Sequence, residues 1–330
     1  MNCRKQRPEM DAPRISIAMC TCNGERFLSE QLESLLKQSL LPFELVVCDD
    51  ASTDSTPLLV EHFAKRTPFA VAVRRNDSRL GVARNFEQAV SLCNGDLIFL
   101  ADQDDVWHPE KIACLARTLG DPRNQAAFSN ANIVADNLGK LGYTKWQQVG
   151  FTSRDQSRAS SGECFPVLLK HQIVTGAALA FKVGLRETAL PIPAGWPHDA
   201  WLALIAAAQK SLTAVPEVLL DYRQHEGNLV GGIRRTLRSE ISAALLIDRT
   251  AWYGRELDLW RTLECRLGAI QVSPDIREAL KEKIRHLENR ASLPNARWRR
   301  IPGVVRELAA GRYGRFARNW GTVAIDLLVK

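Results

Sequence analysis

The chain has 330 residues, of which 45% are hydrophobic and 25% are charged. This composition excludes a disordered or collagen-like chain. The length predicts one large α/β domain with additions, or two domains. Its net charge of +7 is uneven, because residues 1–230 contain 24 Lys and Arg against 26 Asp and Glu, whereas residues 231–330 contain 20 against 11. The sequence has no run of about 18 apolar residues, no signal-peptide pattern and no zinc-like cysteine spacing, which predicts a cytoplasmic protein with reduced thiols and no membrane-spanning helix.

The first hundred residues alternate between strand and helix patterns. After a flexible tail expected at residues 1–13, short apolar runs predict four strands, at residues 15–20, 44–48, 69–73 and 96–100. Apolar residues at three-to-four spacing predict a helix after each of the first three strands. Strands separated by helices form a parallel sheet with helices on both faces.

Polar and acidic residues follow three of these strands. The first strand is followed by Thr21–Gly24, the second by Asp49 and Asp50, and the fourth by Asp102–Asp105. Because ligands bind beyond the carboxyl ends of parallel strands, we expect five carboxylates at one rim of the sheet. Close carboxylates disfavour each other's ionised state, and a divalent cation such as Mg²⁺ or Mn²⁺ relieves that repulsion.

Four motifs occur in order along these elements. They are Ile-Ala-Met-Cys-Thr-Cys-Asn-Gly at 17–24, Val-Val-Cys-Asp-Asp-Ala-Ser-Thr-Asp at 46–54, Arg-Leu-Gly-Val-Ala-Arg-Asn-Phe at 79–86 and Phe-Leu-Ala-Asp-Gln-Asp-Asp-Val-Trp at 99–107. Together they resemble glycosyltransferase family 2, an inverting family that uses nucleotide-sugar donors. The resemblance covers about residues 14–230 and implies an α/β domain of the GT-A fold, with a mostly parallel sheet flanked by helices, followed by a basic helical extension at 231–330.

The resemblance implies a nucleotide-binding role for residues of the first three motifs. Thr21 and Asn23 would lie in the turn that wraps the nucleotide. Asp49 or Asp50 would face the base and the ribose. The pyrimidine edge would meet an arginine, either Arg79 or its competitor Arg84.

The same resemblance implies a metal site in the fourth motif. Asp102 would face the ribose or the metal, and Asp104 would hold the metal that bridges the diphosphate. Further along, the Tyr-Arg-x-His pattern at 222–225, followed by Asn228, is similar to a rhamnosyltransferase-like branch of the family. His225 would complete the metal or diphosphate site as a neutral imidazole, and Arg223 would meet phosphate.

The second half of the chain supplies a candidate general base. Residues 173–181 predict an apolar strand in which Gly176 allows close approach of another group to the backbone. Asp199 begins a predicted helix, where a cap is the commonest use of aspartate. The family resemblance implies instead that Asp199 removes the proton from the acceptor hydroxyl as its oxygen attacks the anomeric carbon. The preceding residue, His198, again resembles the rhamnosyltransferase-like branch.

The chemical identity of the donor and of the acceptor is implied only by the resemblance to the rhamnosyltransferase-like branch. It implies a dTDP- or UDP-linked donor carrying rhamnose or another deoxysugar, although closely similar sequences use other sugars. It also implies a lipid-linked glycan or polysaccharide acceptor at the cytoplasmic face of a membrane.

The basic residues 231–330 predict helices. Apolar spacing indicates two or more helices within 234–290, and a single helical face is predicted near the end by Tyr313, Phe316, Trp320, Val323, Ala324, Leu327 and Leu328. A basic amphipathic helix of this kind is typical of one that lies in an anionic membrane interface, which would make the protein peripheral to the membrane. Packing of the same face on the catalytic domain is the alternative. No nucleic-acid-binding module accompanies the charge, so no nucleic-acid partner is expected.

Two other functions remain open. Asp102–Val106 also fits the Asp-x-Asp-x-Val signature of haloacid-dehalogenase-like phosphatases, with Asp102 as nucleophile, although that motif normally lies on the first strand of its fold. A non-catalytic nucleotide-sugar-binding assembly protein is the other. A nicotinamide-binding Rossmann protein is disfavoured, since Thr21–Gly24 lacks the three-glycine phosphate turn.

Overall fold

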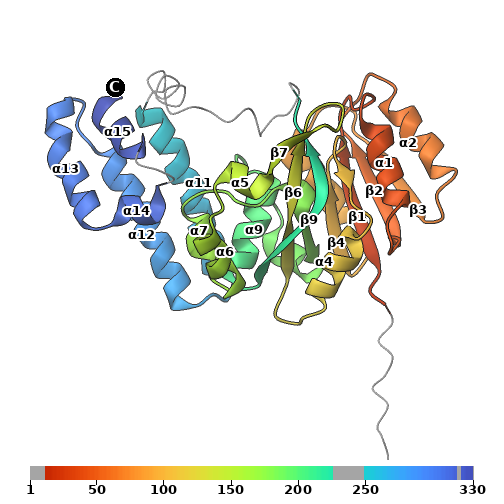
Figure 1. The fold of residues 1–330 in the computed structure, drawn as a ribbon. Coiled ribbons are helices and arrows are strands. Elements are labelled where there is room, and N and C mark those ends of the chain that lie inside the picture. Colours follow the sequence, from red (N-terminus) through yellow and green to blue (C-terminus); the bar gives the residue numbers. More distant parts are fainter. Residues whose placement is uncertain (1–11, 226–248, 318–320, 330) are drawn as a thin grey trace, which may run out of the picture.

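A computed structural model describes residues 12–225, 249–317 and 321–329, and its strands form one sheet (Figure 1). The parallel half has the order β3-β2-β1-β4. Its strands are β1 (Ile15–Thr21), β2 (Glu44–Asp49), β3 (Ala70–Arg75) and β4 (Leu97–Ala101). These bounds confirm the four predicted strands and bring their carboxyl ends to one rim.

The second half of the sheet continues from β4 in the order β8-β6-β9-β5, with β7 paired to β6. The bounds are β5 (Val106–Trp107), β6 (Ala126–Val134), β7 (Lys140–Thr144), β8 (Leu179–Lys182) and β9 (Leu212–Arg223). Strand β8 is antiparallel to both of its neighbours, while β6 and β9 are parallel. Strand β9 therefore ends at the same rim as β1 and β4.

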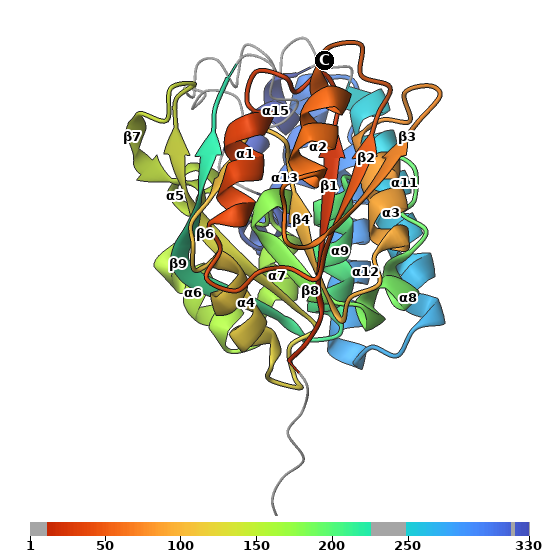
Figure 2. The same ribbon diagram turned by 90° about the vertical axis from the view of Figure 1, so that its right-hand side faces the viewer.

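Helices cover both faces of the sheet because the strand residues alternate between two cores. Ile15, Ile17 and Met19 point toward one core, and Ala18 points toward the other. The first core contains side chains of α1 (Leu28–Leu36), α2 (Thr56–Ala64) and α4 (Lys111–Leu119). The second contains side chains of α3 (Val82–Leu92) and α9 (His198–Ala208). Figure 2 shows α1 and α3 on opposite sides of the sheet.

Residues 173–181 do not form the continuous strand that the sequence predicts. Only β8 is a strand, and it follows the short 3₁₀ helix η1 (Gly176–Ala178). The backbone N–H of Gly176 donates to the carboxylate of Asp199 at 3.0 Å, so it is not available to a neighbouring strand. The predicted close approach at Gly176 is confirmed, since a Cβ there would lie 2.7 Å from Nε2 of His198.

Four short helices complete the first 225 residues. They are α5 (Lys145–Val149), α6 (Ser153–Ser160), α7 (Cys164–Leu168) and α8 (Gly184–Ala189). Helices α6 and α7 lie near each other beside the α9 side of the sheet (Figure 1).

The C-terminal residues form helices that pack on this domain. They are α11 (Arg249–Ala269), α12 (Pro274–Ala291), α13 (Arg297–Ala309), α14 (Arg312–Phe316) and α15 (Gly321–Leu328). Trp260 of α11 meets Trp196 edge to face with ring centroids 5.4 Å apart, and both belong to the same core as α9. The prediction of two or more helices within 234–290 is confirmed for its described part.

The prediction of one helical face from Tyr313 to Leu328 is wrong. Helix α14 ends at Phe316 and α15 begins at Gly321, and Trp320 lies outside the described residues. Tyr313 and Phe316 are only 4% and 3% exposed. Asp326 of α15 is fully buried and accepts hydrogen bonds from the Tyr313 hydroxyl and the Arg290 guanidinium, each at 2.6 Å. Because a buried carboxylate needs such partners, α15 folds back against α12 and α14 instead of extending the helix.

None of the described helices combines the length and the apolar character that crossing a membrane requires.

Candidate active site

The turn after β1 is held by contacts to the loop after β2. Thr21 is 2% exposed, and its hydroxyl donates to Oδ1 of Asp49 at 2.8 Å. Asn23 has a left-handed backbone (φ 49°), which asparagine adopts at lower cost than most residues. Its side-chain oxygen accepts from the backbone N–H of Thr53 at 2.8 Å. Both predicted nucleotide residues therefore lie at the rim, and their contact with a nucleotide stays a prediction.

Asp49 and Asp50 are buried at the end of β2, and protein donors surround both. The backbone N–H of Ser52 donates to Oδ2 of Asp49 at 2.9 Å. Asp50 accepts from the backbone N–H groups of Leu80 and Gly81 at 2.7 and 2.9 Å. The two carboxylates thus hold the backbone of the loops at the rim, and their predicted contact with base and ribose stays a prediction.

The two competing arginines lie in different surroundings. Arg79 precedes the two backbone N–H groups that Asp50 holds, and its positive charge opposes the burial that raises the pKa of the Cys22 thiol. Arg79 is therefore near the turn after β1, with its side chain exposed. Arg84 lies on α3 and donates to Glu87 at 2.9 Å. Arg79 is thus next to the turn after β1, and which of the two arginines meets the nucleotide stays a prediction.

Three carboxylates converge beyond β4. Burial, followed by the negative charges of Asp104 and Asp199, raises the pKa of Asp102 to about 7. Asp199 is thus close enough to interact electrostatically with Asp102, although 97 positions separate them in the sequence. Asp199 was not among the five carboxylates that the sequence placed at this rim, so its position near Asp102 is a finding of the structure.

His225 reaches this cluster from the residues that follow β9. Its Nε2 lies 2.9 Å from Oδ2 of Asp104, and its ring packs on Phe27 with centroids 4.8 Å apart. The two residues predicted as metal ligands therefore lie side by side. Asn228, the last residue of that motif, lies outside the described residues.

Asp199 is held at the start of α9 by two backbone donors. Its Oδ2 accepts from Gly176 at 3.0 Å and its Oδ1 from the N–H of Ala200 at 2.7 Å. The carboxylate therefore has a fixed orientation at the positive end of a helix dipole. His198 stacks on Phe86 with centroids 3.9 Å apart, and burial lowers the pKa of its imidazole, so it packs behind Asp199 as a neutral ring.

Two buried lysines lie near the carboxylates, and the sequence pattern did not predict them. Lys111 is fully buried 3.5 Å from the centroid of the Trp107 ring, and Lys145 lies 4.0 Å from that of Tyr222. Burial lowers the pKa of both ammonium groups, and the charges of Asp105 and Asp102 oppose this shift. Each lysine directly precedes an apolar residue, and no local pattern distinguishes it from an ordinary surface lysine.

Arg223 points into the protein. It is 1% exposed, and its Nε donates to the backbone oxygen of Asp104 at 2.8 Å. The same guanidinium donates to the backbone oxygen of Asp136 and to the carboxylate of Glu30. These contacts contradict the expectation that Arg223 meets phosphate, and they make it a brace for the loop that carries Asp104.

The donor set fits a hard divalent cation held mainly by its substrate. Asp104 and His225 supply one carboxylate and one imidazole, and the described residues contain no group of three or more His, Cys, Asp or Glu side chains that could hold a metal. Mg²⁺ typically uses one or two carboxylates and takes its other ligands from water and substrate phosphates. The negative charges of Asp104 and Asp199 raise the pKa of Asp102, and a bound cation would reduce this repulsion between carboxylates.

Comparison with known proteins agrees with this geometry. Residues 16–166 match the model of Glycosyl transferase family 2. The dTDP-rhamnosyl transferase RfbG of Shigella flexneri is 28% identical over 254 residues, which are 72% of this chain and 82% of RfbG. The putative glycosyltransferase EpsE of Bacillus subtilis is 31% identical over 130 residues, or 39% of this chain, and the match spans about half of EpsE (47%).

A solved structure shares the fold. The mannosyltransferase PcManGT of Pyrobaculum calidifontis, in complex with GDP-Man and Mn²⁺, aligns with a TM-score of 0.54 at 20% identity. The alignment covers 96% of this chain and 85% of that one. The described chain therefore has the predicted GT-A architecture, including its C-terminal helices.

Proposed function

Because residues 16–166 match the model of Glycosyl transferase family 2, we propose that this chain is a member of that family and transfers a sugar from a nucleotide-diphosphate donor to a hydroxyl of a glycan, with inversion at the anomeric carbon. The observation that carries the proposal is the position of Asp199. Its carboxylate interacts electrostatically with that of Asp102 but belongs to a different element, the start of α9. A candidate base and a candidate metal ligand thus share one rim.

Donor binding is assigned to the end of the parallel half of the sheet. Thr21, Asn23 and Arg79 surround the nucleotide, while Asp49 and Asp50 hold the loops that carry them. Asp104 and His225 hold the divalent cation, Mg²⁺ or Mn²⁺, with Asp102 facing the ribose or that cation. When bound, such a cation neutralises charge on the leaving diphosphate.

Asp199 acts as the general base. One carboxylate oxygen takes the proton of the acceptor hydroxyl as the acceptor oxygen forms its bond to the anomeric carbon and the bond to the diphosphate breaks. A base placed in this way contributes about 10²–10⁴-fold to the rate. The backbone donors on Gly176 and Ala200 fix the direction in which Asp199 receives the proton.

The donor and acceptor are proposed from the relatives. The similarity to RfbG over 72% of the chain favours a dTDP-linked deoxysugar such as rhamnose, with a UDP-linked sugar as the second choice. A lipid-linked glycan is the proposed acceptor, and the cytoplasmic face of a membrane is the proposed place of reaction.

The rival functions have less support. A phosphatase with Asp102 as nucleophile is disfavoured because Asp102 follows the fourth strand, whereas that motif normally lies on the first strand of its fold. A non-catalytic assembly role leaves the fixed orientation of Asp199 without a purpose.

Calorimetric titration of the purified chain with dTDP and UDP, with and without Mn²⁺, tests the donor site. We expect binding that requires Mn²⁺ and is lost in Asp104→Ala. Asp199→Asn is expected to bind the same nucleotide as the unaltered chain does and to lower transfer by at least about 10²-fold. Asp77→Asn, an exposed carboxylate near Arg79, serves as the control for charge alone.

Equal loss of nucleotide binding in Asp104→Ala and Asp199→Asn would contradict this division of roles. Binding that is independent of the metal would contradict the assignment of Asp104.

A further inference from the structure

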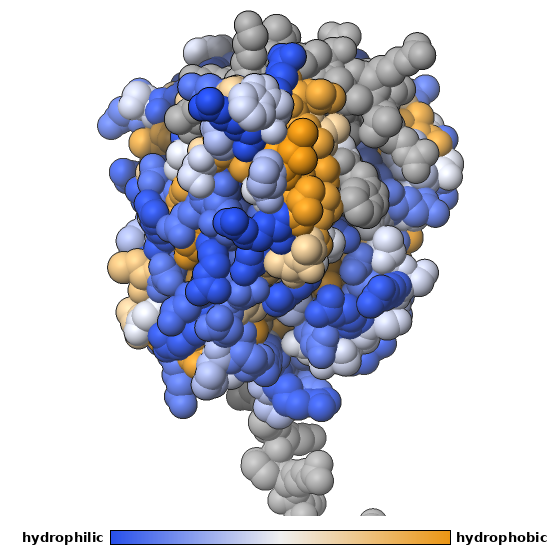
Figure 3. Space-filling model, turned by 90° about the vertical axis from the view of Figure 1, so that its left-hand side faces the viewer, coloured by the Kyte–Doolittle hydropathy of each residue, from blue (hydrophilic) through white to orange (hydrophobic). Residues whose placement is uncertain are grey.

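Helix α13 presents an apolar face to solvent. Trp298, Ile301 and Val305 are 69%, 51% and 55% exposed, and with the exposed Pro302 they recur at the three-to-four spacing of one helix face. Figure 3 views the end of the molecule where α13 lies and shows an apolar stripe with hydrophilic surface along one side. Single exposed apolar residues are ordinary, but a continuous stripe marks an interaction surface.

Arginines lie along both borders of this face. At 100° per residue, Arg299 and Arg306 fall on one flank and Arg297 on the other. All three are exposed, and within the described parts of the chain none of their side chains has a hydrogen bond or an ion pair. The guanidinium of Arg299 lies 4.9 Å from the ring centroid of Trp298, which keeps the charge beside the apolar stripe.

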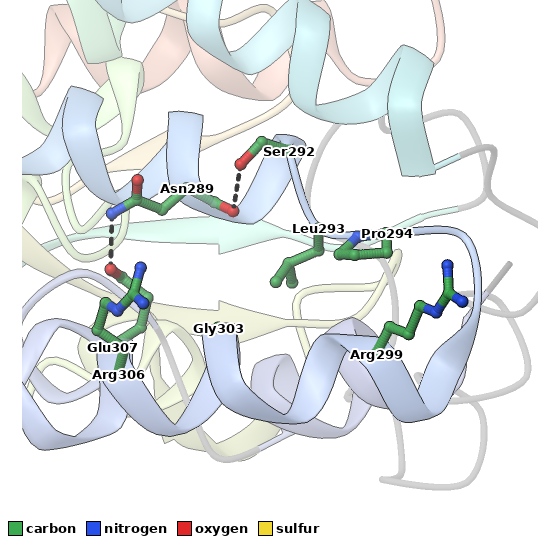
Figure 4. A pocket seen from close by; sticks show the side chains of 8 residues that line it. All are labelled: Asn289, Ser292, Leu293, Pro294, Arg299, Gly303, Arg306 and Glu307. Atoms are coloured by element: carbon green, nitrogen blue, oxygen red, sulfur yellow. Dashed lines mark hydrogen bonds between the residues drawn. The ribbon is translucent and has the colours of Figure 1, made fainter.

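A small hollow lies beside the stripe, between α13 and the end of α12. Its volume is about 170 Å³, and Figure 4 shows Arg299 and Arg306 at its two ends with Gly303 between them. Asn289, Ser292 and Glu307 complete its polar lining. Gly303 has no side chain to fill the hollow, and a Cβ there would lie 2.6 Å from a methyl carbon of Leu293.

The carboxylate of Glu307, which lines this hollow, is already paired within the protein. Glu307 is 2% exposed and accepts hydrogen bonds from His286 at 2.6 Å, Asn289 at 2.7 Å and Arg312 at 2.9 Å. The exposed charges on this side of α13 are therefore positive. The excess of 20 Lys and Arg over 11 Asp and Glu in residues 231–330 has the same sign.

We propose that α13 lies flat on an anionic lipid bilayer, with Trp298, Ile301 and Val305 in the interface and Arg299 and Arg306 around a lipid phosphate. An in-plane helix of this kind buries its apolar face at the boundary between headgroups and acyl chains, and its basic flanks contact anionic lipids. The complementary positive charge favours lipid over a second copy of this chain, because two such faces would repel each other.

This surface replaces the face from Tyr313 to Leu328 that the sequence predicted. It also deepens the proposed function, since it names how the chain would approach a lipid-linked acceptor. Its test does not depend on sugar transfer.

Cosedimentation of the full chain with lipid vesicles tests the proposal. We expect binding to vesicles of phosphatidylglycerol and phosphatidylcholine in equal parts, and little binding to phosphatidylcholine alone. Binding should weaken when salt rises from about 0.1 M to about 1 M, which shortens the Debye length from about 10 Å to about 3 Å. Arg299→Gln with Arg306→Gln should weaken it about 25-fold, at about fivefold for each basic residue.

The apolar arm of the test uses Ile301→Ser with Val305→Ser. The matched controls are Leu58→Ser with Val73→Ser, which are exposed apolar residues elsewhere, and Arg74→Gln with Arg117→Gln. We expect both α13 variants to lose vesicle binding and both control variants to retain it. Thermal unfolding and nucleotide titration of each variant verify that the fold is intact.

Equal binding to neutral and anionic vesicles, or equal binding by the α13 and control variants, would overturn the proposal. So would a wild-type dimer in sedimentation velocity that the α13 variants convert to monomers, because the face would then join two copies. Loss of sugar transfer with vesicle binding retained would count against the proposed function alone.

Discussion

Gly176 lies where the backbone passes directly beside the proposed base. Its N–H contacts the carboxylate of Asp199, and the space in which a Cβ would lie is occupied by the ring of His198. The sequence predicted a close approach at this glycine but not its partner. His198, whose ring occupies that space, comes from the start of α9, 22 positions later. Only the folded chain brings Gly176 and His198 together.

A methyl group at Gly176 should disturb catalysis more than folding. In Gly176→Ala the new Cβ would be 2.7 Å from Nε2 of His198 and 3.6 Å from Cβ of Asp199, so the first turn of α9 must shift. We expect a fall in the rate of transfer of at least about tenfold, because small misplacements of a reacting group are costly. Steady-state kinetics of both substrates would measure it.

Gly184→Ala is the matched control, since no atom lies within 4 Å of its added Cβ. Unchanged kinetics in Gly176→Ala would mean that the position of Asp199 tolerates this shift, which would weaken its assignment as the base.

Carboxylates at the rim illustrate what a sequence pattern leaves undetermined. The alternation of strands and helices predicted correctly that Asp49, Asp50, Asp102 and Asp104 lie at strand ends. It did not predict that Asp50 accepts hydrogen bonds from the backbone of the loop before α3. Such contacts depend on the path of a loop, and loop paths follow from packing rather than from periodicity.

Helices α12 and α13 are joined by a buried pair that responds to pH. His286 is fully buried, and its Nδ1 lies 2.6 Å from a carboxylate oxygen of Glu307. Burial lowers the pKa of His286 to about 4 from an ordinary value near 6.5, although the bond to Glu307 opposes that shift. The pKa of Glu307 is lowered by its bonds to His286 and Asn289, against the effect of burial. The surrounding cations are Lys283, Arg290 and Arg312.

Acidification should therefore destabilise this contact. Between pH 6.5 and pH 4 the unfolded chain binds a proton on His286 that the folded chain excludes, so stability falls as pH falls. From pH 7 to pH 5 the loss from this histidine is about 2 kcal/mol, seen as a lower urea midpoint. In His286→Gln, whose amide still donates to Glu307, the dependence over this range should be about 2 kcal/mol smaller. An equal dependence in both proteins would assign it to other groups.

Element prediction was accurate for the parallel strands and wrong for the last helix. Strand β1 and its neighbours have continuous apolar runs, which a buried parallel strand requires. The stripe from Tyr313 to Leu328 also has helical spacing, but the buried Asp326 turns α15 back toward Arg290. Here the pairing of a buried charge with a residue of another helix determines the chain path, although the apolar spacing alone predicts one continuous helix.

At the scale of the whole molecule, the C-terminal helices share a core with the α/β domain. Trp260 and Leu263 of α11 belong to the same cluster as Trp196 and Trp201. The indole N–H of Trp196 also donates to the backbone oxygen of Leu259 at 3.1 Å. The sequence indicated a boundary near residue 230 from the change in charge, but surface charge carries no information about which apolar faces pack together.

Trp260→Ala should thus lower the stability of the sheet and of the C-terminal helices together. The side chain is 7% exposed, and its truncation is expected to cost about 3 kcal/mol. Calorimetry should show a single transition at a lower temperature, with nucleotide binding lost in that same transition. Trp252→Ala removes an indole that is 44% exposed and should change stability by less than about 0.5 kcal/mol. Two separate transitions would indicate that the helices fold independently of the sheet.

Strand β3 is the long outer edge of the sheet, while the opposite end of the strand order is the two-residue β5. Its outward backbone groups are a template on which another chain could add a strand. Arg74 and Arg75 end β3, and both are exposed. Two such edges that approached each other would bring these like charges together before any backbone hydrogen bond formed. The like charges of these arginines thus disfavour edge-to-edge pairing of two such sheets.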